Sequence, residues 1–182
     1  MSRDVMRNDP ASCTVRSLGS ASEVQLNQLA DVLIDCVAGG ASVSFMHPLR
    51  WPKALAFWRG VAADAQAGKR ILIVAEDDSG IIGTVQVIFA EPENQPHRAD
   101  VAKMLVHRRA RRRGIGEALM CAAEEAARAA GKTVLVLDTA NDDAARLYAR
   151  CGWTLVGTVP DYALLPYGGL CSTRFYYRQL AG

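Results

Sequence analysis

The sequence predicts one α/β domain in which a mixed sheet of about seven strands is flanked by about four helices. Three observations support this fold class. Short segments with strand-like alternation are spread along the chain, segments with helical periodicity lie between them, and no internal repeat or low-complexity segment is present. The length of 182 residues suits a single domain with an adequate core. We expect residues 1–11 to be a flexible N-terminus and residues 12–182 to form the domain.

The first half of the chain predicts a strand, two helices and a pair of strands. Ser20 and Glu23 have the spacing of a capping box at the start of the first helix, which ends at paired glycines. Pro52 lies near the start of the second helix, where its missing N–H is tolerated. An Asp-Asp-Ser-Gly turn joins the strand pair. The predicted elements are a strand (13–18), a helix (20–40), a loop (41–49), a helix (51–69) and a strand pair (70–91).

The second half predicts a strand, a long helix, a second strand, a short helix and two closing strands. Ile115 and Leu119 begin an apolar face on the long helix. The apolar run 133–139 suits a strand that is buried on both faces. The predicted elements are a strand (98–107), a helix (114–131), a strand (133–139), a helix (141–152) and two strands (153–162 and 172–180).

Charge, cysteine usage and hydropathy exclude several classes of protein. The net charge is only +2, which argues against a general nucleic-acid binder. The five cysteines are scattered and form no C-x-x-C pair, so we expect reduced thiols in a cytoplasmic protein. No apolar run approaches the length of a transmembrane helix. His47, His97 and His107 lack the spacing of metal ligands, so no metal site is predicted.

A strand, a glycine-rich turn and a helix meet at residues 108–116, RRARRRGIG. This order favours an anion, because the first N–H groups of a helix have no intrahelical partner and the helix dipole attracts negative charge. Gly114 and Gly116 let a ligand approach the backbone, and the arginines can add charge-assisted hydrogen bonds. Glu117 and Leu119 exclude a Walker loop and a dinucleotide fingerprint, respectively. The alternative is a basic surface turn that only begins a helix.

Two polar residues share one face of the short helix that follows. Asn141 and Tyr148 are seven residues apart, which places them two helical turns and about 10 Å from each other. Both side chains should therefore face the same cleft or the same neighbouring element. The alternatives are a helix N-cap for Asn141 and a half-buried core tyrosine for Tyr148.

Together these segments resemble the GNAT-type acetyltransferase family. Residues 111–116 match its R/Q-x-x-G-x-G/A pyrophosphate loop, and residues 141–153 match its N-x-x-A-x-x-L-Y-x-x-x-G-aromatic motif. The resemblance covers the whole chain in the order of its elements. It implies the GNAT fold, with a mostly antiparallel sheet, and acetyl-CoA as the cofactor.

Four further segments resemble the tabtoxin-resistance acetyltransferases and their relatives, which acetylate a β-lactam amino acid antimetabolite. The segments are 37–46, 99–106, 136–139 and 160–180. This resemblance implies an N-acetyltransferase that moves the acetyl group of acetyl-CoA by direct transfer. The acceptor would be the amine of a small amino-acid-like or antibiotic substrate, which implies a role in antibiotic resistance.

The family resemblance also implies where the cofactor binds. Acetyl-CoA would lie in a cleft where the parallel strands 98–107 and 133–139 separate. Backbone groups of the first strand would pair with the pantetheine arm and polarise the acetyl carbonyl, a contribution of about 2–4 kcal/mol. Arg108 and Arg109 would contact the 3′-phosphate or only solvate the surface, and we favour the latter. The implied cofactor-binding residues are Met104, Leu105, Val106, Arg111, Arg112, Arg113, Gly114, Ile115, Gly116 and Asn141.

Direct transfer needs a base, because an amine with a pKa of about 10.4 is protonated at neutral pH. Asp100 and Asp138 match acidic residues of the tabtoxin-resistance relatives, and either could accept the proton. Their alternatives are a solvated strand end for Asp100 and a turn or cap residue for Asp138. Tyr148 would donate to the departing CoA sulfur. Cys151 is expected to pack the helix rather than carry an acyl group.

The acceptor pocket would be bordered by the loop 39–49, the turn 166–169, Tyr162 and Tyr167. A protein or peptide N-terminus is an alternative acceptor, and a non-catalytic acyl-CoA-binding protein is an alternative function. An RNA-binding patch is disfavoured because no aromatic residue interleaves the arginines. The closing strand offers an exposed edge, which makes a homodimer an open alternative.

Overall fold

The computed structural model describes residues 13–180, so the expected flexible N-terminus at 1–11 lies outside this range. Within it, seven strands form one sheet in the order β1-β2-β3-β4-β5-β7-β6, accompanied by four α-helices and one 3₁₀ turn. The predicted fold class is confirmed. The strands are β1 (Thr14–Leu18), β2 (Arg70–Asp77), β3 (Gly80–Phe89), β4 (Arg98–Val106), β5 (Val134–Thr139), β6 (Thr154–Leu164) and β7 (Leu170–Gln179). The helices are α1 (Glu23–Ala38), α2 (Trp51–Gln66), the 3₁₀ turn η1 (Arg108–Ala110), α3 (Ile115–Ala129) and α4 (Asp142–Arg150).

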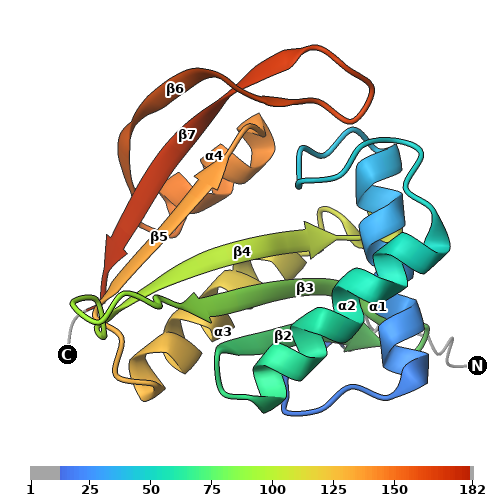
Figure 1. Cartoon of the computed structure of the whole chain (residues 1–182), viewed down its shortest axis with the longest axis horizontal. Coiled ribbons are helices and arrows are strands. Elements are labelled where there is room, and N and C mark those ends of the chain that lie inside the picture. The colour runs from blue at the N-terminus through green and yellow to red at the C-terminus, as the bar shows by residue number, and fades with distance from the viewer. Residues whose placement is uncertain (1–12, 181–182) are drawn as a thin grey trace, which may run out of the picture.

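Helices cover both faces of the sheet (Figure 1). Helices α1 and α2 pack on one face, with a core that includes Leu33, Trp58 and Leu72. Helices α3 and α4 contribute to a second core, which includes Leu119 and Tyr148. No helix within residues 13–180 is long and apolar enough to span a membrane.

Helix α1 begins two residues later than the sequence suggests. The predicted capping box of Ser20 and Glu23 is wrong, because Ser22 and Gln25 form it instead. The Ser22 hydroxyl accepts from the Gln25 N–H at 3.3 Å, and Gln25 Oε1 accepts from the Ser22 N–H at 3.0 Å. The sequence holds two serines with suitable residues three positions on, and the one nearer the apolar face caps the helix.

The strands β4 and β5 separate because β4 stays paired with β3 while β5 stays paired with β7. Between Thr84 and Gln86 of β3, the partner on β4 changes from Leu105 to Ala102, so β4 carries one extra residue. Such a bulge bends a strand. The parallel ladder of β4 with β5 includes only the first residues of each strand, whereas β5 stays paired with β7 along its whole length. The two strands consequently open into a V (Figure 1).

Strand β5 is fully buried on one face only. Leu135 and Leu137 are buried, but Val134 and Val136 are partly accessible and Asp138 is exposed. The prediction that 133–139 is buried on both faces is therefore wrong. Leu135 and Leu137 belong to the core that α3 and α4 share, whereas α1 and α2 pack mainly on β2, β3 and β4 and leave the opposite face of β5 uncovered.

Candidate functional site

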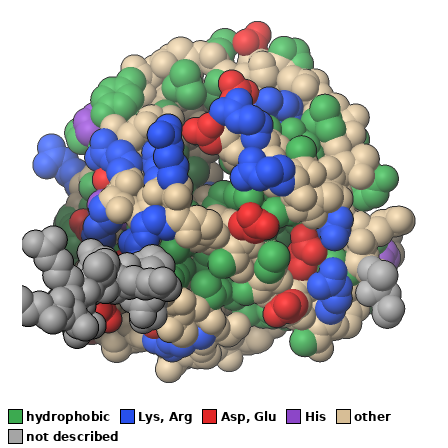
Figure 2. Space-filling model, turned by 180° about the vertical axis from the view of Figure 1, so that it is seen from behind, with side chains coloured by type: hydrophobic (Ala, Val, Ile, Leu, Met, Phe, Trp, Pro, Cys, Tyr) green, Lys and Arg blue, Asp and Glu red, His purple; other side chains and the backbone are tan. Residues whose placement is uncertain are grey.

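A cleft of about 990 Å³ fills the opening between β4 and β5. Its walls come from the second half of β4, the glycine-rich turn with the start of α3, helix α4, and the loop between α1 and α2. Figure 2 shows Lys and Arg side chains around a hollow on the face opposite to that of Figure 1. The arginines that line the cleft are Arg111, Arg112, Arg146 and Arg150.

Strand β4 lines the cleft with backbone that has no strand partner on that side. The ladder with β5 ends at Asp100, so the edge from Val101 to Val106 faces open space. Met104, Leu105 and Val106 are all among the lining residues. The Val106 carbonyl is already used, because it accepts from Arg111 Nε at 3.2 Å and from the Cys36 thiol at 3.6 Å.

The glycine-rich turn presents the N-terminus of α3 to the cleft. Gly114 is the N-cap, has a φ of 76°, and supplies no side-chain hydrogen bond to the first turn. The first N–H groups of α3 are therefore available to an anion. Ile115 itself is buried and anchors the turn to the core. At Gly116 a Cβ atom would lie 3.0 Å from Leu147 Cδ2, so a larger residue would press on this side chain of α4.

Three of the arginines near this turn are held by carboxylates. Arg113 pairs with Asp77 at 3.2 Å and is not among the described residues that line the cleft. Arg108 Nε lies 2.8 Å from Asp35 Oδ1, and the Arg108 backbone N–H donates to Asp35 Oδ2 at 2.8 Å. Arg109 lies 3.7 Å from a second carboxylate of α1. Arg111 and Arg112 are therefore the arginines of the turn that reach the cleft.

Helix α4 places Asn141 and Tyr148 on the cleft, and both also serve the fold. Asn141 Oδ1 accepts from the Ala144 N–H at 2.9 Å, which makes Asn141 the N-cap. Tyr148 is only 5 % exposed and packs beside Trp153 and Tyr176. Burial raises the pKa of the Tyr148 phenol, as does the nearby charge of Asp138. The phenol is therefore protonated at neutral pH.

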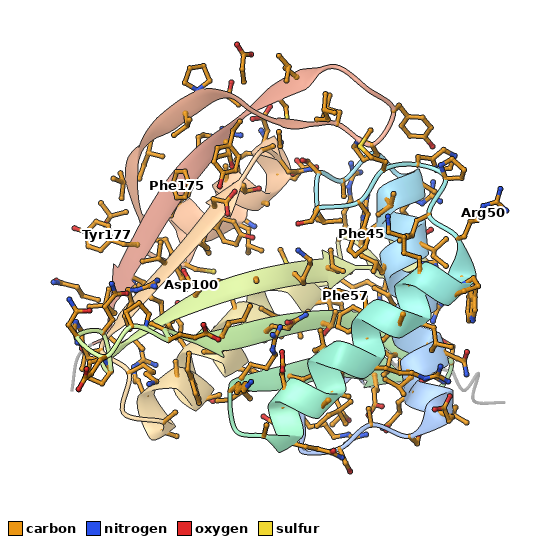
Figure 3. The ribbon with its side chains drawn as sticks, viewed as in Figure 1. Phe45, Arg50, Phe57, Asp100, Phe175 and Tyr177 are labelled. Carbon is orange, nitrogen blue, oxygen red and sulfur yellow. The ribbon has the colours of Figure 1, made fainter. Side chains whose placement is uncertain are left out.

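The two candidate carboxylates lie in different places. Asp138 lines the cleft, and its Oδ2 accepts from Thr173 Oγ1 at 2.8 Å. Asp100 is not among the described residues that line the cleft, and its carboxylate pairs with Arg98 at 2.8 Å. Figure 3 shows Asp100 toward the start of β4, away from Phe45 and Phe57 at the other end. The structure thus brings Asp138, and not Asp100, together with Tyr148.

One end of the cleft is closed by the α1–α2 loop and the β6–β7 turn. The His47 N–H donates to the Pro166 carbonyl at 2.9 Å, and Tyr167 Oη donates to the Ala38 carbonyl at 2.8 Å. Tyr162 packs against Phe175 and does not line the cleft. Of the expected border, the α1–α2 loop from Gly40 to Ser44 reaches the cleft.

Lys103 is a cleft residue that no motif in the sequence predicts. It lies at the bulge of β4, with a φ of 50°, and its Nζ donates to Ser44 Oγ at 3.1 Å. A signal was present, since Lys103 interrupts the apolar run of a predicted strand. Desolvation lowers the pKa of its ammonium.

The cysteines show no sign of a reactive thiol in the cleft. Cys36 lines the cleft, but burial raises the pKa of its thiol to about 11. Cys151 packs partly buried against the α3–α4 core, and burial raises the pKa of its thiol too. No group of three His, Cys, Asp or Glu side chains within residues 13–180 is arranged to hold a metal ion.

Comparison with known proteins identifies the family. The family model described as an acetyltransferase (GNAT) domain matches residues 68–155. The chain is 31% identical over 140 residues to an uncharacterized N-acetyltransferase from the hisH–hisA intergenic region of Azospirillum brasilense. The aligned segment covers 76% of this chain and 81% of the relative.

Solved structures share the fold. An N-acetyltransferase from Staphylococcus aureus Mu50 superposes with a TM-score of 0.79 at 18% identity, covering 94% of this chain and 100% of that chain. A phosphinothricin acetyltransferase from Sinorhizobium meliloti in complex with acetyl-CoA gives a TM-score of 0.77 at 19% identity, covering 93% and 89%. The chain belongs to the GNAT family of acetyl-CoA-dependent N-acetyltransferases.

Proposed function

We propose that this enzyme acetylates the amine of a small amino-acid-like acceptor, a class that includes the β-lactam amino acid antibiotics of the tabtoxin-resistance type. One observation carries the proposal. The cleft between β4 and β5 has the open N-terminus of α3 on one side, while Asp138, the one of the two candidate bases that lines the cleft, and the phenol of Tyr148 face it from the other. The choice of acceptor follows from the resemblance of four sequence segments to the tabtoxin-resistance enzymes and is part of the proposal.

The cleft residues suit acetyl-CoA, which supplies an acetyl group activated as a thioester. The N–H groups at Gly114–Gly116 and the guanidinium groups of Arg111 and Arg112 would hold the diphosphate. The unpaired edge of β4 at Met104 and Leu105 would align the pantetheine arm.

Asp138 would bind the acceptor ammonium and take its proton, directly or through water. The Thr173 hydroxyl holds one oxygen of this carboxylate, which fixes its orientation toward the cleft. Tyr148 keeps its proton on Oη and would stabilise the departing sulfur by a hydrogen bond. No covalent acyl-enzyme is required.

The closed end of the cleft favours a small acceptor over an extended peptide. The contacts of His47 with Pro166 and of Tyr167 with Ala38 join the α1–α2 loop to the β6–β7 turn. An extended peptide would have to pass between these two segments, and their hydrogen bonds would have to break. A free amino acid needs no such opening.

The test is an acceptor screen followed by a matched pair of variants. The purified enzyme is given acetyl-CoA and an amine panel of tabtoxinine-type β-lactam amino acids, phosphinothricin, common amino acids and a peptide with an N-terminal alanine. Release of the CoA thiol reports turnover. We expect transfer to amino acids and little to the peptide. A preference for the peptide would contradict the proposal.

The two carboxylates then serve as test and control. We expect Asp138→Asn to lower kcat/KM for the best acceptor by about 100-fold or more, because the base is lost. Asp100→Asn should change it by less than about threefold, since its carboxylate pairs with Arg98 outside the cleft. The reverse ranking would assign the base to Asp100.

A further inference from the structure

Lys103 is aimed into the cleft by an unusual backbone. The bulge of β4 places an extra residue opposite β3, and Lys103 adopts a φ of 50° there. Residues other than glycine rarely take this conformation, so the surrounding structure must hold it. A bulge can turn a side chain away from the direction that the regular strand would give it. Here it directs a lysine into the space between β4 and β5.

The ammonium of Lys103 meets neutral groups and no ion-pair partner. Its Nζ donates to Ser44 Oγ at 3.1 Å and lies 5.9 Å from the centre of the Phe57 ring. Figure 3 shows Phe57 and Phe45 pointing toward one another beside this end of β4. Within residues 13–180, no carboxylate lies within ion-pair distance of Lys103.

The charges around Lys103 leave room for an anion. Desolvation lowers the pKa of its ammonium. The negative charge of Asp138 on β5 raises that pKa in part, and the positive charge of Arg70 on β2 lowers it further. A desolvated cation without a direct partner is stabilised by any anion that enters the cleft. The lysine can contribute up to three donors, and Ser44 occupies one of them.

The cleft therefore offers a positive group on β4 and a negative group on β5. An α-amino acid carries the complementary pair, a carboxylate and an ammonium on one carbon. We propose that Lys103, assisted by the Ser44 hydroxyl, binds the carboxylate of the acceptor while Asp138 receives its amine. This inference rests on the proposed function and narrows it, because it makes the α-carboxylate a requirement for the substrate.

The test combines a change in the enzyme with a change in the substrate. Each amino acid acceptor is compared with its own primary carboxamide, which keeps the amine and loses the negative charge. The kcat/KM for both members is measured with wild type, Lys103→Met and Lys103→Arg. Taking the ratio between enzymes for each substrate cancels the different basicity of the two amines.

We expect Lys103→Met to lower kcat/KM for the acid by roughly 10- to 100-fold and for the carboxamide by less than about twofold. Lys103→Arg should keep part of the preference for the acid, because the charge remains. The control is Lys53→Met. Lys53 also lies over a phenylalanine ring of this region, Phe45, but is exposed outside the cleft. That variant should behave as wild type with both substrates.

The inference would be overturned if Lys103→Met lowered kcat/KM equally for the acid and the carboxamide. It would also be overturned if the wild-type enzyme had the same kcat/KM for both substrates. The proposed function would survive either result. Acetylation of Lys103 itself, found by mass spectrometry of the enzyme after turnover, would also overturn it. If wild type binds acetyl-CoA but acetylates neither member of any pair, the proposed small-amine acceptor is wrong and the carboxylate site is refuted with it.

Discussion

Tyr148 holds its proton throughout the neutral pH range, because burial and the charge of Asp138 both raise the pKa of its phenol. A free thiol has a pKa of about 8.5, so full proton transfer from such a phenol to a thiolate is unfavourable. In the proposed reaction Tyr148 therefore acts as a hydrogen-bond donor to the sulfur, and solvent delivers the proton afterwards. Its packing beside Trp153 and Tyr176 keeps Oη in place for that contact.

Replacing Tyr148 by phenylalanine separates this chemical role from packing. The ring stays, so the core contacts with Trp153 and Tyr176 should persist. We expect kcat to fall by roughly 100-fold, because the donor to the sulfur is lost. Affinity for acetyl-CoA, measured by calorimetry, should change little. A large loss of affinity with intact turnover would refute the role of Tyr148 in sulfur departure.

The two aspartates show why single residues were only partly predictable. In the sequence, Asp100 and Asp138 have equal claims, since each lies near one end of a strand that borders the cleft. The structure separates them, because Asp100 pairs with Arg98 before the strands diverge and Asp138 lies beyond that point. The point at which β4 and β5 separate depends on a bulge between β3 and β4. No local sequence pattern predicts this bulge.

The glycine-rich turn is tied to helix α1 by charge pairs. The carboxylate of Asp35 on α1 accepts hydrogen bonds from the Nε and the backbone N–H of Arg108. Burial alone would raise the pKa of Asp35, but these hydrogen bonds and the neighbouring charges of His107 and Arg108 outweigh it and lower the pKa. The pair therefore anchors η1, which leads into the turn at the cleft.

This tether predicts a pH-dependent contribution to stability. Because the pKa of Asp35 is lowered below its ordinary 3.8 in the folded state, its contribution is present above that value and is lost as the pH falls through the folded pKa. We expect Asp35→Asn to reduce the free energy of unfolding by about 1–2 kcal/mol at neutral pH. Urea unfolding at pH 7 and in strong acid measures the difference, which should shrink in acid.

Asp31 on the same helix provides the control. It is 51% exposed and lies 3.7 Å from Arg109 and 3.4 Å from His107. Such an exposed pair contributes little, so Asp31→Asn should cost less than about 0.5 kcal/mol. If both variants lose the same stability at pH 7, Asp35 does not form a special anchor.

Helices and strands were largely predictable where local chemistry decides them. The apolar periodicity of α3 and the glycine-rich turn before it predicted an element that the structure confirms. The exceptions arise from long-range packing. The start of α1 depended on which serine adjoined the buried face, and the exposure of β5 depended on how far α1 and α2 extend across the sheet. Lys103 was missed because a bulge, not strand alternation, sets its direction.

The fold makes the cleft by joining two sheet halves along a short parallel contact. Strands β1 to β4 carry α1, α2 and α3, whereas β5 to β7 carry α4, so each wall of the cleft belongs to its own half (Figure 1). The loops that close one end connect the two halves through His47 and Tyr167. The two halves are thus joined at two places, by the short β4–β5 ladder and by these two hydrogen bonds.

The most direct test asks whether acetyl-CoA binds in this cleft. At Gly114, no atom lies within 4 Å of the position that a Cβ would take, although φ is 76°. A carboxylate introduced by Gly114→Asp therefore fits beside the start of α3 and repels a diphosphate there. Gly114→Ala is the matched control, since it imposes the same backbone demand without the charge.

Calorimetric titration with acetyl-CoA compares the three proteins. We predict saturable micromolar binding by wild type, a modest loss in Gly114→Ala, and a loss of at least about 100-fold in Gly114→Asp. Gly114→Asp that folds normally and binds acetyl-CoA as wild type does would contradict the assignment of the cleft, and the cofactor would then have to bind elsewhere on the protein.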